Sequence, residues 1–282
     1  MRRLLSLLPL LTFLSVSASA HAGQVDKDEL DDKTWSGVVR CMQCDRQDAI
    51  DLGMLITGSK PVFPSDFECR DIDEGWAIDY SSKRDRAALH GGIDIPAPRG
   101  TPILAVADGK VVAMFDNHET AVGVRVFLQH APMQTGKPFW AYSEYAHLQE
   151  LPALQIGSQV KRGDVVGLTS NTGISGQAAR AKAGGSSARP GKTRRDALHF
   201  AIMYSESPDF AVLQKNGGYL VPVRAQWMDP VSFYRSTPPY DSDAVAGLKE
   251  SEKQIRIPFQ TPGGAVHPPE SKLIWPYTCL PR

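Results

Sequence analysis

The stretch His90-Gly91-Gly92-Ile93-Asp94 combines an imidazole and a carboxylate four residues apart. Two adjacent glycines and the β-branched Ile93 and Ile95 disfavour a helix, so the chain is expected to be extended here. In an extended chain, positions 90, 92 and 94 point to the same side, and Gly92 leaves a gap between the two polar groups. An ion of zinc's size, about 2 Å from each ligand, fits such a gap. His-x-x-x-Asp alone is a weak signal, and this stretch has a partner far downstream, His199.

The elements that must position these residues have the pattern of an all-β domain. Pro102 to Ala107 and Lys110 to Phe115 are expected to form a hairpin, because Asp108-Gly109 between them is a strong turn signal. Further strands are expected at Gly123 to His130, Trp140 to Leu148 and Leu198 to Tyr204. Short strands at regular spacing predict a compact antiparallel β sandwich or barrel, here with irregular N- and C-terminal extensions.

The chain of 282 residues divides into a leader at 23–85, the β core at 86–235 and a proline-rich C-terminal extension at 236–282. Its 31 basic and 31 acidic residues give no sign of nucleic-acid binding. Within the core, a basic loop at 177–196 lacks the apolar residues that packing needs. It is interpreted either as a solvated loop or as a flap that contacts an anionic wall polymer or membrane surface.

Residues 1–22 have the composition of a secretory signal peptide. Arg2 and Arg3 precede an apolar run from Leu4 to Val16, which is too short to span a bilayer comfortably, and small residues follow it. We therefore expect a periplasmic or secreted protein with no stable membrane span after cleavage. An uncleaved anchor is the alternative interpretation.

The chain contains four cysteines, Cys41, Cys44, Cys69 and Cys279. An even number in an exported protein predicts disulfides, and the sequence does not choose among the three possible pairings. A bridge from an early cysteine to Cys279 would tie the C-terminal extension to the body. Cys41 and Cys44 could be half of a zinc site, but the chain has no second Cys-x-x-Cys to complete it.

Six stretches in order resemble the lysostaphin-type (LytM-like) zinc metalloendopeptidases, which cut peptide cross-links in bacterial peptidoglycan. These are His90 to Ile95, Gly100 to Gly109, Tyr145 to Leu148, Val160 to Gly167, Asn171 to Gly176 and Leu198 to Phe200. The resemblance implies a compact antiparallel β core with a groove, a zinc cofactor and a peptidoglycan peptide as substrate.

The resemblance also implies roles for individual residues. His90, Asp94 and His199 match the zinc ligands, and His147 matches a catalytic histidine beside the metal. Two imidazoles and a carboxylate leave one position of a tetrahedral zinc open for water, as catalytic zinc sites do. Without the resemblance, His147 would be interpreted as a packed core histidine. His130 also occupies a position where the family often has histidine, and we expect it to be structural.

The sequence departs from the family pattern at Ala197, where the family usually has the first, catalytic histidine of a His-x-His motif. Loss of a general acid or base typically costs about 10²–10⁴ in rate. The alternative is therefore a catalytically weak or inactive peptidoglycan-binding regulator of the amidase-activator type. Arg195 has the same strand parity as His199 and could offer positive charge to an oxyanion. A lipoyl-like or sugar-phosphotransfer domain is a third interpretation, which the signal peptide disfavours.

Overall fold

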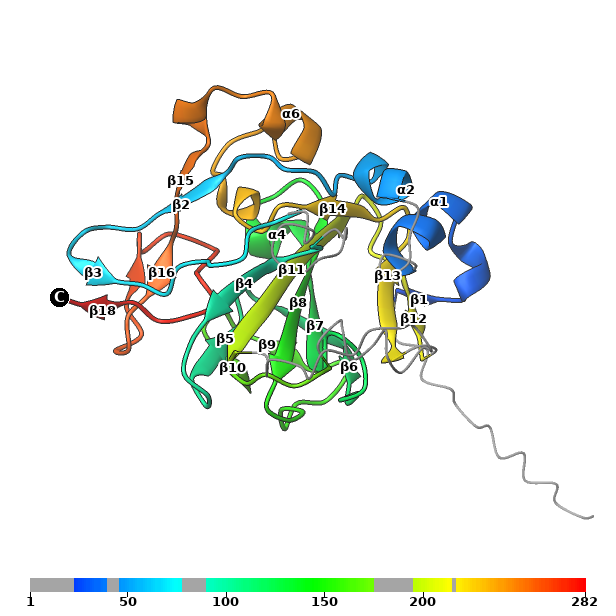
Figure 1. Ribbon diagram of the computed structural model, residues 1–282, viewed down its shortest axis with the longest axis horizontal. Coiled ribbons are helices and arrows are strands. Elements are labelled where there is room, and N and C mark those ends of the chain that lie inside the picture. The colour runs from blue at the N-terminus through cyan, green and yellow to red at the C-terminus, as the bar shows by residue number, and fades with distance from the viewer. Residues whose placement is uncertain (1–22, 40–45, 78–89, 175–194, 215–216) are drawn as a thin grey trace, which may run out of the picture.

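The computed structural model describes residues 23–39, 46–77, 90–174, 195–214 and 217–282, and it is built mostly of strands with short helices (Figure 1). It confirms the all-β prediction for the core. The predicted signal peptide, Cys41, Cys44 and most of the basic loop lie outside the described residues.

One seven-stranded sheet forms the centre of the molecule, with the order β14-β11-β8-β7-β6-β9 and β4 paired to β11 (Figure 1). All of its strand pairs are antiparallel. The strands are β4 (Ile93–Pro96), β6 (Gly109–Phe115), β7 (Val124–His130), β8 (Trp140–Leu148), β9 (Gln159–Val160), β11 (Ala197–Ser205) and β14 (Gln226–Met228). Within the described residues the end strands β9 and β14 do not pair, so the sheet is not closed into the barrel that was one of the expected forms. Strands of two and three residues offer too few backbone groups for such a closure.

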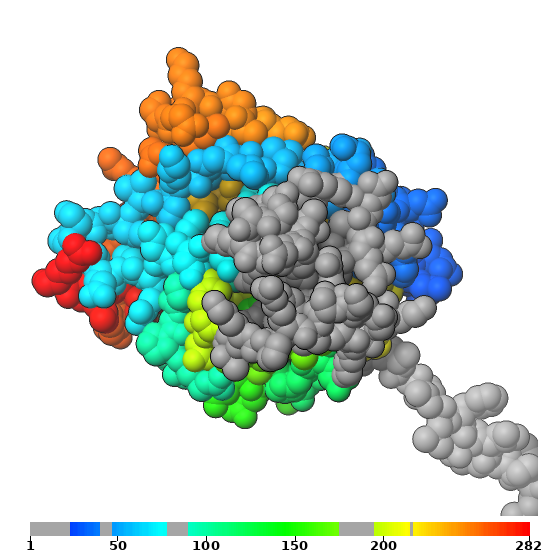
Figure 2. Space-filling view, in the orientation of Figure 1, coloured from blue at the N-terminus to red at the C-terminus, as the bar shows by residue number. Residues whose placement is uncertain are grey.

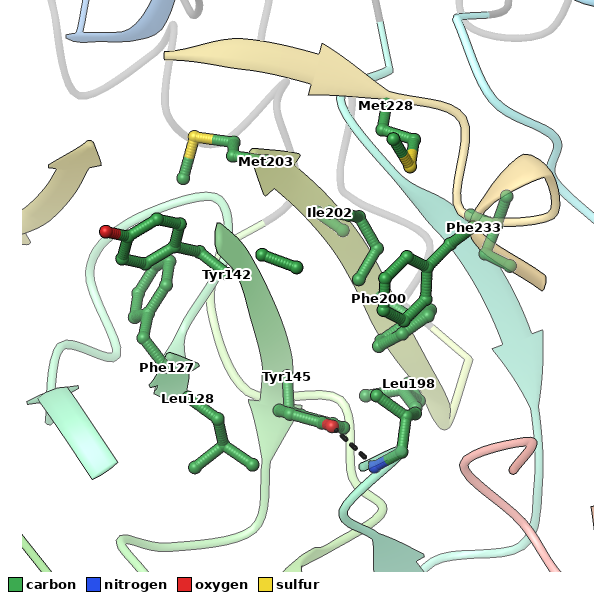
Figure 3. Close-up of a cluster of buried hydrophobic side chains, with 14 of the residues drawn as sticks. Phe127, Leu128, Tyr142, Tyr145, Leu198, Phe200, Ile202, Met203, Met228 and Phe233 are labelled. Carbon is green, nitrogen blue, oxygen red and sulfur yellow. Dashed lines mark hydrogen bonds between the residues drawn. The ribbon is translucent and has the colours of Figure 1, made fainter. Parts of the chain in front are cut away.

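The core beside this sheet is aromatic. Tyr145 of β8 and Phe200 of β11 lie with ring centroids 5.5 Å apart, and the Val106 backbone N–H donates to the Tyr145 hydroxyl at 3.0 Å (Figure 3). Trp275 and Tyr277 of the C-terminal extension are fully buried in the same cluster. The extension is therefore part of the folded core rather than chain that only lies over it.

The predicted hairpin at Asp108-Gly109 is wrong. β5 (Pro102–Leu104) pairs with β10 (Val165–Leu168), whereas β6 pairs with β7 and β9. The Asp108 carboxylate accepts the Arg162 backbone N–H at 2.9 Å, so this acid fixes a neighbouring loop while the chain crosses between two sheets. A two-residue turn signal cannot distinguish a hairpin from such a crossing.

The leader and the C-terminal extension add small sheets around the centre. These pair β1 (Gln24–Val25) with β12 (Phe210–Leu213) and β13 (Tyr219–Pro222), β2 (Lys60–Val62) with β15 (Gln254–Arg256), β16 (Phe259–Gln260) with β17 (Val266–His267), and β3 (Phe67–Glu68) with β18 (Leu280–Pro281). The last pair lies side by side at the edge of the molecule (Figure 1). A disulfide joins Cys69 to Cys279 there, which resolves one of the pairings that the sequence left open.

The helical elements are short and lie outside the central sheet. They are η1 (Lys27–Glu29), α1 (Asp32–Thr34), η2 (Trp35–Val39), α2 (Arg46–Asp51), α4 (Pro132–Thr135), η4 (Ser232–Tyr234), α6 (Ser242–Ala246) and η5 (Glu250–Glu252). Asp31 and Asp241 begin two of them, because each carboxylate accepts a backbone N–H of the first turn. Among the residues that the structure describes, no helix has the length and apolar character to cross a membrane.

Candidate metal centre

The three residues predicted as metal ligands meet at the junction of β4 and β11. Asp94 lies in β4 and His199 in β11, and the antiparallel register places them directly opposite each other. Directly opposed side chains on one face of a sheet are neighbours. His90 comes just before β4, so an extended chain turns its side chain to the same face as Asp94. Together they form a cluster of candidate metal ligands whose ligand atoms all lie within 4.8 Å of one another.

The ligand atoms of this cluster have the separations that a zinc ion requires. His90 Nε2 lies 3.1 Å from His199 Nδ1 and 3.3 Å from Asp94 Oδ1, and His199 Nδ1 lies 3.1 Å from Asp94 Oδ1. Four tetrahedral ligands at about 2.0–2.1 Å from zinc are about 3.3 Å apart. All three residues are buried, at 6–8% exposure. The nearly equilateral triangle therefore fits zinc, with a fourth position left for another ligand.

Gly92 is required for this packing. A Cβ at position 92 would lie 2.6 Å from the Phe200 carbonyl oxygen and 2.8 Å from both Cε1 and Nε2 of His199. Carbon atoms do not approach so closely without displacement. The space beside Gly92, which the sequence suggested as room for an ion, is instead filled by the His199 ring.

His90 and Asp94 are oriented by groups behind the cluster. His90 Nδ1 lies 3.0 Å from the carbonyl oxygen of Gly75, which can only accept a hydrogen bond. When the ring is neutral, Nδ1 therefore carries its proton, and Nε2 presents its lone pair to the cluster. Burial alone would raise the pKa of Asp94, but the charges and hydrogen bonds of His90 and His199 hold that pKa well below its usual range. Asp94 is thus ready to bind a cation as a carboxylate.

His147 reaches the cluster because β8 contains a bulge. In the β7–β8 ladder Val124 pairs with Leu148 and Arg125 with Ala146, so His147 is the extra residue, with φ of +64°. Bulges bend a strand and redirect a side chain. The His147 ring lies 5.8 Å from that of His199, and its Nδ1 lies 3.0 Å from the Thr172 carbonyl oxygen. Its catalytic role stays a prediction.

Ala197 lies on the same side of β11 as His199, and Arg195 comes two residues before this strand. Ala197 is buried opposite Pro96 and offers only a methyl group. The Arg195 guanidinium donates to Asp73 and lies 3.6 Å from Glu74 Oε1 and 3.7 Å from Asp94 Oδ2. Burial alone would lower the pKa of Arg195, but the hydrogen bond to Asp73 and the charges of the three carboxylates raise it. These contacts place Arg195 against carboxylates and do not support a role as oxyanion donor.

The other histidines in the described part of the chain lie outside the cluster. His130 is fully buried, with Nδ1 2.8 Å from the Asp108 carbonyl oxygen and Nε2 2.8 Å from the Ser143 hydroxyl, and burial lowers its pKa to about 4. Its hydrogen bonds join β7 to β8 and to the start of β6, as expected of a structural residue. His118 and His267 do not contribute to the cluster of candidate ligands.

The groups that orient the ligands could not be found from residue types and spacing. Gly75 acts through its backbone carbonyl, which no residue type marks. Asp73 and Glu74 contact Arg195 across more than a hundred positions of sequence. The only available signal was an acidic pair placed before Gly75-Trp76 in an otherwise irregular leader.

Comparison with known proteins finds a family match within the core. Residues 88–209 match the model of Peptidase family M23. Peptidoglycan DD-endopeptidase ShyA of Vibrio cholerae is 34% identical over 114 residues, which cover 38% of this chain and 24% of that protein. DD-carboxypeptidase/endopeptidase Mpg of Neisseria meningitidis is 37% identical over 87 residues, which cover 31% of this chain and 18% of that protein. The chain therefore spans only a quarter or less of the length of these curated relatives.

Solved structures also resemble part of the chain. The structure of LytU is 26% identical, with a TM-score of 0.35, and the match covers 50% of this chain and 78% of that one. A zinc-containing peptidase from Vibrio cholerae is 23% identical, with a TM-score of 0.35, over 52% of this chain and 36% of that one.

Proposed function

Because residues 88–209 form a peptidase family M23 domain, we propose that this chain is an exported, zinc-dependent endopeptidase that hydrolyses peptide cross-links of bacterial peptidoglycan. The observation that carries the proposal is the buried triangle of His90 Nε2, Asp94 Oδ1 and His199 Nδ1, with sides of 3.1–3.3 Å. Two imidazoles and a carboxylate are a ligand set of catalytic zinc. The names of the Vibrio relative, a peptidoglycan DD-endopeptidase, and of the Neisseria relative, a DD-carboxypeptidase/endopeptidase, support the choice of substrate.

Different residues of the site would bind the metal and transfer protons during amide hydrolysis. A zinc ion held by His90, Asp94 and His199 would supply Lewis-acid chemistry, polarising a peptide carbonyl and acidifying water at neutral pH. His147 keeps its Nδ1–H on Thr172, so its Nε2 can accept a proton from the attacking water and pass it to the leaving amine. Since Ala197 offers no proton-transfer group, we assign the proton steps to His147 alone.

The proposal is tested on the purified mature protein. We expect about one zinc per chain by metal analysis, and conversion of cross-linked muropeptide dimers to monomers by mass spectrometry. A chelator should stop the conversion and added zinc should restore it, whereas His199→Ala should lose both metal and activity. A wild-type chain without zinc would contradict the proposal. A zinc-loaded chain that leaves the dimers intact would instead favour the amidase-activating regulator.

Two observations support export. Residues 1–22 have the composition of a signal peptide, and one relative is named as a peptidoglycan endopeptidase. Mass spectrometry of the protein recovered from a periplasmic extract should show a chain that begins between residues 19 and 23. Recovery of the uncut chain in the membrane fraction would favour the uncleaved anchor. We also propose that the basic loop at 177–196 contacts an anionic wall polymer. Co-sedimentation with purified cell walls tests this, because rising salt concentration should weaken such binding.

A further inference from the structure

Residues 73–77, called here the wall segment, extend the sheet beside the metal centre. β4 pairs with β11 on one side, and the wall segment lies along its other side. Three backbone hydrogen bonds join them: Asp73 N to Asp94 O at 3.1 Å, Asp94 N to Glu74 O at 2.9 Å and Ala77 N to His90 O at 2.9 Å. Two of the proposed ligands therefore have their backbone fixed by this segment.

The wall segment also contacts the side chains of the same two ligands. The Gly75 carbonyl oxygen lies 3.0 Å from His90 Nδ1. Asp73 accepts two hydrogen bonds from the Arg195 guanidinium, which lies 3.7 Å from Asp94 Oδ2. Asp94 Oδ1 faces His90 and His199, so the positive charge of Arg195 lies beside the other carboxylate oxygen, Oδ2.

Part of the wall segment is packed into the molecule: Glu74, Trp76 and Ala77 are buried, whereas Asp73 is exposed. Trp76 is 5% exposed, donates from Nε1 to the Leu55 carbonyl oxygen at 2.6 Å and lies with its ring 6.3 Å from that of Trp227. In the space-filling view, the later part of the leader, drawn in cyan, lies on the same face as the yellow-green residues near the start of β11 (Figure 2). The segment lies outside the matched family domain, which begins at residue 88.

We infer that the wall segment is a component of the metal centre, that it holds His90 and Asp94 in ligand geometry, and that Arg195 is the positioning residue that couples it to Asp94. The inference rests on the proposed zinc function. Partners of metal ligands fix ring orientation and carboxylate orientation, and their loss usually costs metal affinity. It follows that the functional unit is larger than the family domain and includes part of the leader.

Thermodynamic linkage gives the first test. If the wall segment favours zinc binding, zinc must favour the ordered wall segment by the same factor. Hydrogen exchange of the Asp73 and Ala77 amides should slow on zinc addition by roughly 5- to 150-fold more than exchange of a control amide in the same leader. The control is Lys60, whose N–H donates to the Lys253 carbonyl oxygen at 2.9 Å in the β2–β15 sheet. Equal changes at all three amides would overturn the inference.

The second test uses Arg195→Lys, which keeps the charge but loses the planar fork that holds Asp73 while reaching Asp94. We expect the zinc Kd, measured by chelator competition, to rise by roughly 10- to 100-fold. The matched control is Arg99→Lys, because Arg99 is half-exposed, pairs with Asp196 at 3.0 Å and reaches none of the ligands. The melting temperature of the metal-free protein should be the same in the two variants, which a merely structural Arg195 would not allow.

The two proposals fail in different ways. A wild-type chain that binds no zinc refutes the proposed function, and this inference with it. A wild-type chain that binds zinc, together with an Arg195→Lys variant of unchanged zinc Kd, overturns the inference and leaves the proposed function intact.

Discussion

At the metal centre, two residues with very small side chains have opposite consequences. Gly92 leaves the space that the His199 ring occupies, so the ligands can converge. Ala197 leaves a methyl group where the resembling family has a histidine, so the site has fewer groups that can move a proton. One small residue therefore favours metal binding, and the other reduces the chemistry available to the bound metal.

Gly92→Ala should disrupt metal binding, because its Cβ would meet the Phe200 carbonyl oxygen at 2.6 Å and the His199 ring at 2.8 Å. The His199 ring must shift to relieve the overlap. We expect at least about a tenfold weaker zinc affinity and a loss of about 1–3 kcal/mol in the free energy of unfolding, measured by chelator competition and urea denaturation. Gly263→Ala is the control, since a Cβ there meets nothing within 4 Å. Wild-type zinc affinity in Gly92→Ala would contradict this packing.

Ala197→His should raise activity if the chain is a weakened enzyme. A restored general acid or base is worth about 10²–10⁴ in rate, so we expect kcat on muropeptide dimers to increase by at least about tenfold. Zinc content should not change. Ala197→Leu adds bulk without an ionisable group and should not raise kcat. Unchanged turnover in Ala197→His, at full zinc content, would favour the regulatory function.

Among the elements, the bulge in β8 and the connection after β14 show how a sheet is adapted at single positions. The bulge turns His147 towards the metal centre. After β14, Asp229 is fully buried and accepts hydrogen bonds from the Thr57 hydroxyl and the Val231 backbone N–H. This carboxyl joins the leader to η4, and burial raises its pKa to about 6.

The raised pKa of Asp229 predicts a pH dependence of stability. Its pKa is about 6 in the folded protein, against 3.8 for an unperturbed aspartate, so the folded state binds more protons between these values. The free energy of unfolding should therefore fall by about 2 kcal/mol as pH rises from 4 to 7. His130, with its pKa lowered from 6.5 to about 4, acts in the opposite direction over nearly the same range. The two contributions largely cancel in the wild-type curve.

Asp229→Asn separates these contributions, because an amide keeps the hydrogen bonds but does not titrate. The stability of Asp229→Asn relative to wild type, from urea denaturation, should rise by about 2 kcal/mol between pH 4 and pH 7. Asp243→Asn is the control, since Asp243 is exposed at the start of α6. A constant difference between Asp229→Asn and wild type across this range would show that Asp229 is not protonated in the folded protein.

At the scale of the molecule, the residue types around His90 and the strand periodicity were enough to predict an all-β core. The resemblance to the zinc endopeptidases named the three residues that the structure brings together. Residue types and periodicity did not predict the β5–β10 pairing, because a two-residue turn signal carries no information about partner strands. They missed the wall segment, because Gly75 acts through a backbone carbonyl. The proline-rich composition of the C-terminal extension also gave no sign that Trp275 is fully buried.

The Cys69–Cys279 disulfide connects the leader to the end of the chain across 210 positions, so its loss should affect both stability and the metal centre. A cross-link that closes so long a loop mainly restricts the unfolded chain, and replacing both cysteines by serine should cost about 2–5 kcal/mol of unfolding free energy. Cys69 lies four positions before Asp73, so the wall segment should also open more often.

Hydrogen exchange in the double-serine protein measures this opening. The Asp73 and Ala77 amides should exchange faster than in wild type under native conditions, because their hydrogen bonds to Asp94 and His90 form in the part of the leader that the disulfide restrains. The Trp227 amide donates to the Leu52 carbonyl oxygen at 2.7 Å, away from the wall segment. Its exchange rate should increase less. Equal acceleration at all three amides would mean that the disulfide stabilises the whole fold without a specific effect on the metal centre.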